Sequence, residues 1–407
     1  METRSLGRRR PRAVLPFDSP EALRSTWERL DAWLRAQDFE GYDPYDSLNA
    51  TRLPRVFKAT PRRRQLVVQA GKWSPVNVRP LLGVAPHRNC KALALVASAS
   101  ATLHRLERDP VRESLATSLL AELEERGALG RGAMAWGYEF DVQTRWSFYP
   151  RGTPNIIVTT FVGNAFLDWY EITSDPALLA TAVAAVGYLN EELLGPGDGA
   201  YYSYVPGNRV LVHNANALGC ALTSRVARLN GDRELKALAR KAAEASLEAQ
   251  FRSGLWPYGR EPSLQWVDGF HTAYVLDGLC ELFATSPDET LHDALRAGFA
   301  AYTGMLFGRQ GEPRYTPASL YPLDIHSAAT AVDVLSRREE AGVSGLTLAR
   351  RVSAWTLDKM WDPRGYFYFQ RHRLSANRIP YVRWSQAHML RALGSLLGAV
   401  QGDTARG

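Results

Sequence analysis

Four histidines recur in the second half of the chain, each beside residues that could bind a substrate or take part in proton transfer. His213, His271, His326 and His388 follow one another at intervals of about 55 to 62 residues. Histidine exchanges protons near neutral pH, and a nearby carboxylate can orient its imidazole ring. The pattern therefore predicts an acid–base site, whose candidate catalytic residues are His271, Asp268, His326, Asp324, His213 and His388.

The same residues also have a purely structural interpretation. Helix N-termini leave backbone N–H groups without partners, and polar side chains at the first turn satisfy them. Helix capping and buried hydrogen bonding would account for any one of these histidines. Four histidines in register favour a shared site over four separate structural roles.

Aromatic loops precede these clusters and favour carbohydrate binding. Segments with a glycine followed by alternating aromatics lie at 199–204, 254–258 and 365–369, and this alternation predicts short strands or hairpins. Aromatic rings can stack on sugar rings, and packing of the loops themselves is an equal alternative. The aspartates among the candidate residues could instead form turns. The candidate substrate-binding residues are Tyr42, Asp43, Asp46, Trp136, Tyr138, Asp141, Asn214, Asn216, Trp256, Tyr258, Trp266, Arg383, Trp384 and Gln386.

The cysteines do not indicate a disulfide framework. Cys90, Cys220 and Cys280 are an odd number, lie in apolar helical contexts and include no close pair. Zinc binding with His213 or His271 is an alternative, but the chain has no closely spaced Cys or His pair typical of structural zinc sites. We expect small core cysteines, with no metal and no cofactor.

Two interleaved sets of helices position the candidate residues. The first set is amphipathic and begins near Ser19, Asp109, Asp175, Asp232, Asp288 and Ser344. The second set is more apolar and begins near Asn89, Asn155, His213, Asp268, Asp324 and Arg383. Both sets recur at about 55 to 70 residues, and such a period indicates repeated helical hairpins.

The polarity of the two sets predicts two concentric rings. An amphipathic helix faces solvent, whereas one that is apolar nearly all round is surrounded by protein. We therefore predict an all-α fold, an (α/α)6 toroid of six helical hairpins with short aromatic β-hairpin loops at one mouth. It should occupy 19–400 as one domain, between a basic, flexible tail at 1–18 and a short tail at 401–407. The inner-helix starts should meet at that mouth.

Composition and charge fit a globular protein that does not enter a membrane. Hydrophobic residues make up 45% and charged residues 22% of the chain. The net charge of +7 comes largely from basic clusters at 7–12 and 61–64, which we expect to be solvated, with acidic head groups, nucleic acid and polyanionic sugars as alternatives. No apolar run is long enough to span a bilayer and no secretory signal is recognisable, so we expect a cytoplasmic protein without specific nucleic-acid binding.

With the repeats placed, the chain resembles the six-hairpin toroids of N-acylglucosamine 2-epimerases and unsaturated glucuronyl hydrolases. Segments at 41–46, 79–83, 152–155, 213–216 and 266–272 also resemble poorly characterised proteins encoded beside bacterial exopolysaccharide and lipopolysaccharide biosynthesis enzymes. The resemblance implies a carbohydrate-active enzyme of surface-polysaccharide formation, of epimerase, isomerase or lyase type. Its partner would be a sugar, an oligosaccharide or a lipid-linked glycan.

Three other functions stay open at this point. A glycoside hydrolase would use paired carboxylates, with Asp141, Asp268 and Asp324 as candidates. A non-catalytic glycan-binding or assembly protein would need the aromatic residues and not the histidines. A terpenoid cyclase or prenyltransferase would call for an aspartate-rich motif, and no such run is present.

Overall fold

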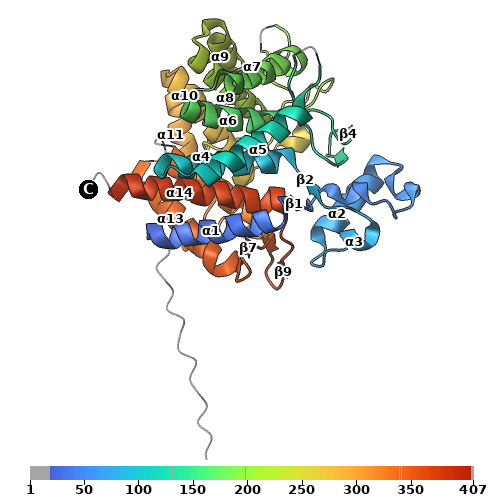
Figure 1. The fold of residues 1–407 in the computed structure, drawn as a ribbon. Coiled ribbons are helices and arrows are strands. Elements are labelled where there is room, and N and C mark those ends of the chain that lie inside the picture. The colour runs from blue at the N-terminus through green and yellow to red at the C-terminus, as the bar shows by residue number, and fades with distance from the viewer. Residues whose placement is uncertain (1–18, 131, 198, 339, 341, 405–407) are drawn as a thin grey trace, which may run out of the picture.

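Helices in two concentric rings form the body of the protein (Figure 1), whose computed structural model describes residues 19–404 apart from 131, 198, 339 and 341. The inner helices are α4 (Cys90–Leu106), α6 (Ile156–Thr173), α8 (His213–Asn230), α10 (Gly269–Thr285), α12 (Ile325–Arg337) and α14 (His388–Thr404). The outer helices are α1 (Pro20–Ala36), α5 (Pro110–Gly127), α7 (Pro176–Tyr188), α9 (Arg233–Leu247), α11 (Glu289–Met305) and α13 (Gly342–Met360). The predicted all-α toroid of six hairpins is confirmed. The predicted tail at 1–18 lies outside the described residues.

Burial separates the two rings as the sequence predicted. In α8 every residue from His213 to Ala227 is buried. The following outer helix, α9, buries only a stripe of small residues, namely Ala239, Ala242, Ala243, Ala245 and Ser246. An inner helix is therefore covered on all sides, whereas an outer helix covers its neighbour with one face and leaves the other in solvent.

The ring is closed by its last helix. Each inner helix packs against the next in the chain, and α14 packs against both α12 and α4. The first helix, α1, covers α14 from outside and buries Leu23, Trp27, Leu30 and Leu34. The sixth hairpin therefore combines the last inner helix with the first outer helix.

Side-chain caps fix where most helices begin. Asp109, Asp175, Asp232 and Asp288 cap the outer helices, and Asn89, Asn155, Asp268 and Asp324 cap the inner ones, by accepting a hydrogen bond from a first-turn N–H. The structure differs at α14, where Arg383 and Trp384 lie in a π-helical segment, Val382–Ala387, that precedes the α-helix. These starts bring the polar clusters to one end of the ring.

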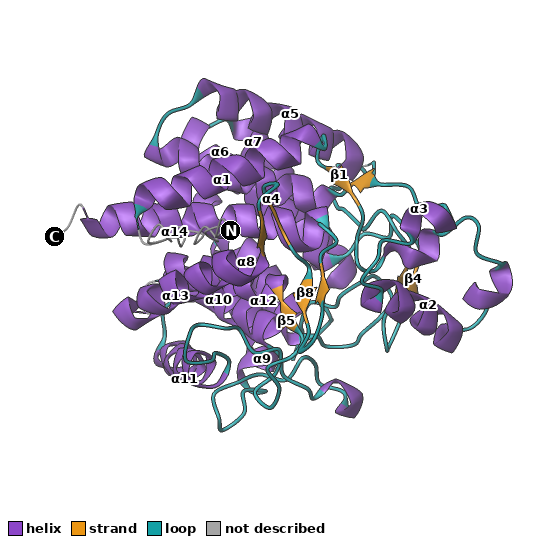
Figure 2. Cartoon of the chain, turned by 90° about the horizontal axis from the view of Figure 1, so that it is seen from below, coloured by secondary structure: helices purple, strands orange, loops and turns teal. Residues whose placement is uncertain are grey.

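Short strands and long loops gather at this end, the mouth of the ring (Figure 2). The strands are β1 (Glu40–Gly41), β2 (His87–Arg88), β3 (Val142–Gln143), β4 (Phe148–Tyr149), β5 (Leu323–Asp324), β6 (Trp361–Asp362), β7 (Tyr366–Phe367), β8 (Gln370–Arg371) and β9 (Ala376–Asn377). Of the three aromatic loops, the one at 365–369 contributes to a hairpin, β6 with β7. The other two make single bridges, Leu194 with Tyr202 and Val212 with Gly259.

One excursion from the ring, residues 47–86, extends beyond the mouth (Figure 1). It contains α2 (Pro61–Trp73), the one-turn helix α3 (Arg79–Leu82) and a 3-10 turn, Arg55–Lys58. Arg79 holds it to the ring through a buried ion pair with Asp46 and a 2.8 Å hydrogen bond to the Tyr381 hydroxyl.

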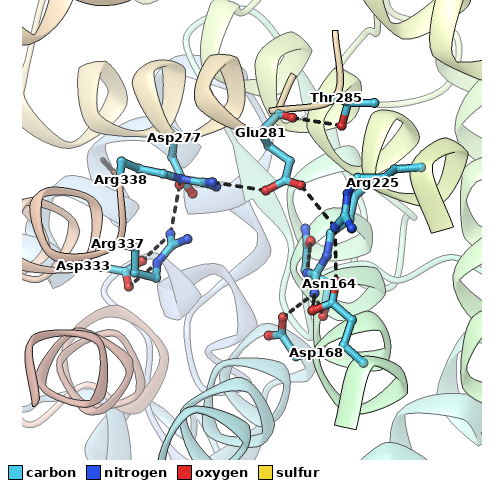
Figure 3. Close-up of polar contacts among 11 residues, drawn as sticks. Asn164, Asp168, Arg225, Asp277, Glu281, Thr285, Asp333, Arg337 and Arg338 are labelled. Atoms are coloured by element: carbon cyan, nitrogen blue, oxygen red, sulfur yellow. Dashed lines mark hydrogen bonds and ion pairs between the residues drawn. The ribbon is translucent and has the colours of Figure 1, made fainter. Parts of the chain in front are cut away.

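A belt of ion pairs links neighbouring inner helices away from the mouth (Figure 3). Arg105 pairs with Glu171 between α4 and α6, and Arg225 pairs with Asp168 between α8 and α6. Arg337 bridges α12 to Asp277 of α10 at 2.9 Å and also pairs with Asp333. The remaining members of this ion-pair belt are Arg228, Glu281, Arg338 and Arg391.

The cysteines and the helix lengths agree with the sequence-based expectations. Cys90, Cys220 and Cys280 are all buried and unpaired, as small core residues are. In the part of the chain that the structure describes, no helix combines the length and apolar character needed to cross a bilayer.

Candidate functional site

A hydrogen-bonded chain of two histidines and a tyrosine lies where α10, α12 and α14 meet. The hydroxyl of Tyr274 lies 2.8 Å from Nε2 of His326 and 3.5 Å from Nε2 of His388. Nδ1 of His326 lies 3.0 Å from the carbonyl oxygen of Trp384, which can only accept, so Nδ1 carries the proton of a neutral ring. The lone pair of His326 Nε2 therefore accepts the Tyr274 proton, and His388 can donate to the same hydroxyl oxygen.

Burial keeps both histidines of this chain uncharged. It lowers the pKa of His326 and of His388 well below the ordinary histidine value, and the nearby cationic side chains lower it further. Burial also raises the pKa of the Tyr274 hydroxyl well above its usual range. At neutral pH the cluster consequently holds two uncharged imidazoles joined by a phenol that keeps its proton.

A second pair, His271 with Asp268, lies at the start of α10. Oδ1 of Asp268 caps the helix by accepting from the backbone N–H of His271 at 2.8 Å, and Oδ2 lies 2.7 Å from Nδ1 of the same residue. The His271 side chain is 21% exposed, whereas Asp268 is buried. Because the carboxylate accepts the Nδ1 proton, Nε2 of a neutral His271 keeps a free lone pair.

Aromatic rings surround the two histidine groups. Tyr258 and Trp266 stack at 4.4 Å between ring centroids, and Tyr258 packs edge-on against His271. Phe270 contacts the rings of both His271 and His326, at 4.1 and 5.1 Å. The two groups are therefore neighbours, and the half-buried Tyr258 and Trp266 lie on the side nearer to solvent.

Lys91 belongs to the same cluster and was missed by sequence reasoning. Its Nζ lies 3.9 Å from the ring centre of Phe161 and 5.3 Å from that of Tyr274. Burial, followed by the charge of Arg383, lowers the pKa of this amine well below its usual range. The signal was present, because Lys91 follows the cap Asn89 by two residues just as His326 follows Asp324.

The candidate carboxylates are held in internal hydrogen bonds. Asp324 accepts from Gln370 Nε2 at 2.5 Å, from Trp384 Nε1 at 2.9 Å and from a backbone N–H, and burial raises its pKa. Asp43 makes a two-pronged ion pair with Arg383 at 2.5 and 2.9 Å. Asp141 accepts a 2.9 Å hydrogen bond from the backbone N–H of Arg151 in a turn, and Asp46 forms the buried ion pair with Arg79.

Several predicted site residues face the outer ring instead of the cluster. Nδ1 of His213 lies 3.2 Å from the Ser246 hydroxyl of α9, so His213 is separated from the other three histidines. Asn216 donates to the same hydroxyl at 2.9 Å. Trp136 and Trp256 are buried and donate to backbone carbonyls of α5 and α9. The expected shared site therefore contains His271, His326 and His388 but not His213.

Four further candidates lie at the mouth with different environments. The Tyr138 ring packs under the guanidinium of Arg383 at 4.9 Å. Gln386 binds the backbone N–H and carbonyl of Phe367, both at 2.8 Å, and so fixes β7. Asn214 is buried, and Oδ1 has no hydrogen-bond partner among the described residues. Tyr42 is half-buried beside the Asp46 ion pair.

Comparison with known proteins identifies the fold and no family. No family model and no curated protein matches the chain. The chain is similar in structure to the cellobiose 2-epimerase of Bacillus thermoamylovorans, with 12% identity over 93% of this chain and 98% of that chain and a TM-score of 0.67. A possible member of the GH105 family from Salmonella enterica has 11% identity over 97% of each chain, with a TM-score of 0.62. A family 88 glycosyl hydrolase from Bacteroides vulgatus has 7% identity over 94% of this chain and 99% of that chain, with a TM-score of 0.60.

Proposed function

We propose that the protein is a carbohydrate-active enzyme that transfers protons at a sugar carbon, as epimerases, isomerases and lyases do. The observation that carries this proposal is the pairing of a basic His271, oriented by Asp268, with the neighbouring chain of His326, Tyr274 and His388. The similar fold of a cellobiose 2-epimerase supports the same class of reaction. The surface-polysaccharide context and a glycan substrate are part of this proposal and rest on the sequence segments that resemble such proteins.

The two histidine groups suit removal and return of a proton at a carbon next to a carbonyl. An unprotonated imidazole nitrogen takes the proton of that carbon, and the electron pair moves to the carbonyl oxygen to give an enolate. The other histidine group returns a proton to the same carbon from the other face, which inverts it; because burial leaves its imidazoles uncharged at rest, this group first takes up that proton from solvent. Within the second group, Tyr274 can give its proton to His326 and recover one from His388, so the three side chains can pass a proton between them.

Hydrolysis by paired carboxylates is less well supported. A hydrolase needs one carboxyl group to protonate the leaving oxygen and a second that is free to act as base or nucleophile. Here Asp268 is held by His271, Asp324 accepts three hydrogen bonds, and Asp141 caps a turn. The free lone pairs of this region belong to imidazole nitrogens.

Solvent deuterium exchange tests the proposal directly. The wild-type protein is incubated in D2O with a panel of reducing sugars that includes cellobiose, N-acylhexosamines and uronic acids, and proton NMR follows the hydrogen on the carbon next to the carbonyl. We expect deuterium to enter at that carbon of one sugar class, with formation of its epimer. Because acid–base groups contribute about 10²- to 10⁴-fold to rate, His271→Gln and His326→Gln should each lower exchange by at least about 100-fold.

His292→Gln is the matched control, since His292 lies on the outer helix α11 with its side chain 59% exposed. It should exchange at the wild-type rate. Exchange that persists within about threefold in both site variants would refute the assignment of the bases. Release of a shorter sugar without deuterium at carbon would instead identify a hydrolase.

A further inference from the structure

The excursion at 47–86 carries positive charge without acidic residues to balance it. The sequence contains no Asp or Glu between Asp46 and Glu107. Six basic side chains of this segment have no carboxylate partner within the described part of the chain, and those with partners bind neutral groups. They are Arg52, Arg55, Lys58, Arg62, Arg63 and Arg64. This surface therefore attracts anions.

The same excursion exposes large apolar side chains. Trp73 is 68% exposed and Leu66 is 69% exposed, although residues of these types are usually well covered in a folded domain. The other members of this group are Val56, Phe57, Val76 and Leu81, each about half exposed or more. Such a concentration on one small segment indicates a surface that meets a partner.

On α2 the basic and apolar side chains share one face. Arg63, Leu66, Ala70 and Trp73 are exposed and follow one another at intervals of three or four residues, so they line one side of the helix. The opposite side packs inward, where Val68 is buried and Gly71 approaches Ser47 so closely that a Cβ would collide with its hydroxyl. The outer face of α2 is consequently left without a cover from the residues that the structure describes.

The excursion is fixed beside the mouth. Lys72 Nζ donates to the Tyr45 hydroxyl at 3.2 Å, and the Tyr45 ring contacts Trp384, which stacks on His326. Asn377, in β9, donates to the carbonyl of Ser74 at 2.9 Å. A partner that binds α2 would therefore lie beside the residues that pack against His326.

We propose that this excursion docks the protein onto the anionic surface of a lipid bilayer. An exposed helix face that combines tryptophan and leucine with arginine is suited to the interface between head groups and acyl chains. The aliphatic side chains decide between a membrane and a soluble polyanion, because an acidic polysaccharide in water would neutralise the arginines and could stack on Trp73 but would leave Leu66 and Leu81 exposed. Docking would present the mouth of the ring to substrates at the membrane surface. The docking proposal itself does not depend on the function proposed above.

Vesicle sedimentation with the full chain tests this proposal. Vesicles of phosphatidylcholine alone are compared with vesicles that contain about 30% phosphatidylglycerol, at low and at physiological salt. We expect the wild-type protein to bind the anionic vesicles only, and to bind them less at higher salt. Leu66→Ser/Trp73→Ser and Arg62→Glu/Arg63→Glu should each bind at least about tenfold more weakly, because each removes one of the two contributions.

Matched controls change exposed residues outside the excursion. Leu374→Ser removes a leucine that is 96% exposed, and Arg252→Glu/Arg296→Glu makes the same change in charge elsewhere. Both should bind as the wild type does. All four variants should keep the wild-type melting temperature, since the replaced side chains are on the surface.

Three results would overturn the proposal. The first is no binding to either vesicle, including the case in which the protein binds only an acidic polysaccharide such as alginate. The second is equal binding of the wild type and both excursion variants. The third is a wild-type dimer in light scattering that Leu66→Ser/Trp73→Ser converts to a monomer, because this face would then be an interface between two copies of the chain.

Discussion

The hydroxyl of Tyr274 holds two buried histidines in one hydrogen-bonded chain, although nothing in its local sequence marks it as a site residue. It follows His271 by three residues on α10, so the two side chains leave neighbouring positions on one face of the helix. That spacing places His271 nearer to solvent and Tyr274 deeper among the inner helices.

Tyr274→Phe should slow proton exchange while leaving the fold in place. It removes the group that accepts from His388 and donates to His326, and we expect deuterium exchange to fall by about 100-fold, the lower end of the range of acid–base contributions. Loss of one buried hydroxyl should cost about 1 to 3 kcal/mol in unfolding free energy. Deuterium NMR and urea denaturation measure the two effects.

Tyr302→Phe is the control for that substitution, because Tyr302 is a buried tyrosine of the outer helix α11. It should keep the wild-type exchange rate. Equal rates in the two variants would remove Tyr274 from the proton-transfer chain.

His213 shows why residue types alone did not define the site. Its position at the start of an inner helix matches that of the other histidines, but its ring faces Ser246 of the outer ring. The pair Asp268 and His271 was predictable, since a cap and a residue three positions later meet at a helix start. Which way a helix is turned about its axis depends on packing that sequence spacing does not reveal.

His213 should make the protein less stable in mild acid. Burial lowers its pKa to about 4 from an ordinary value of 6.5, so above pH 6.5 the ring is neutral in both states and has no effect. As the pH falls, the unfolded chain gains a proton that the folded chain refuses. We expect this residue to lower the unfolding free energy by about 2 kcal/mol between pH 7.5 and 5.

Urea denaturation at the two pH values measures this loss of unfolding free energy. His326 and His388 should add to the loss, because burial lowers their pKa values as well. In His213→Gln the difference between pH 7.5 and pH 5 should shrink by the contribution of His213. An unchanged difference would mean that His213 can be protonated in the folded protein.

Among the elements, helix boundaries were the most predictable feature. Asp and Asn before apolar or amphipathic runs marked nearly every start, because unsatisfied N–H groups require a cap wherever a helix begins. The helices of the excursion, α2 and α3, were not predicted, since they interrupt the repeat. The basic run at 62–64 was expected to be solvated. Arg62 and Arg63 are exposed, but they belong to a helix whose exposed face also carries Leu66 and Trp73.

The ion-pair belt should stabilise the ring in a pH-dependent way. Although burial raises the pKa of Asp333 and Asp277, Arg337 and its neighbours outweigh burial and hold both values below the ordinary one. Arg337→Met leaves the two carboxylates with fewer partners, so we expect a loss of about 3 to 5 kcal/mol in unfolding free energy at pH 7.5. Without Arg337 the pKa values of the two carboxyl groups should rise. The groups would then take up protons at pH 5, so the loss in unfolding free energy should be smaller there.

Urea denaturation of Arg337→Met at both pH values checks this prediction. Arg296→Met is the matched control, because Arg296 and Asp293 are 3.5 Å apart on an exposed surface, and it should change stability by less than about 0.5 kcal/mol. An identical loss for Arg337→Met at both pH values would show that the carboxylates stay charged without Arg337.

At the scale of the whole molecule, closure of the ring depends on its last helix. The period of the repeat predicted six hairpins, and closure follows because α14 packs on α4 and under α1. A chain that ends at residue 381 lacks α14 and uncovers Leu23, Trp27 and Leu30 of α1. It should lose cooperative thermal unfolding by circular dichroism and bind a hydrophobic dye. A sharp melting transition in this shortened chain would show that five hairpins suffice.

The same closure has a consequence for synthesis of the protein on the ribosome. Lys91 is translated long before His388, so the cluster of Lys91, Tyr274, His326 and His388 cannot assemble until the start of α14 has been synthesised. Until then the inner faces of α1 and α4 lack their partner, and such apolar surfaces are what chaperones and proteases recognise. A chain that stalls before α14 would therefore lack the assembled cluster and be marked for removal.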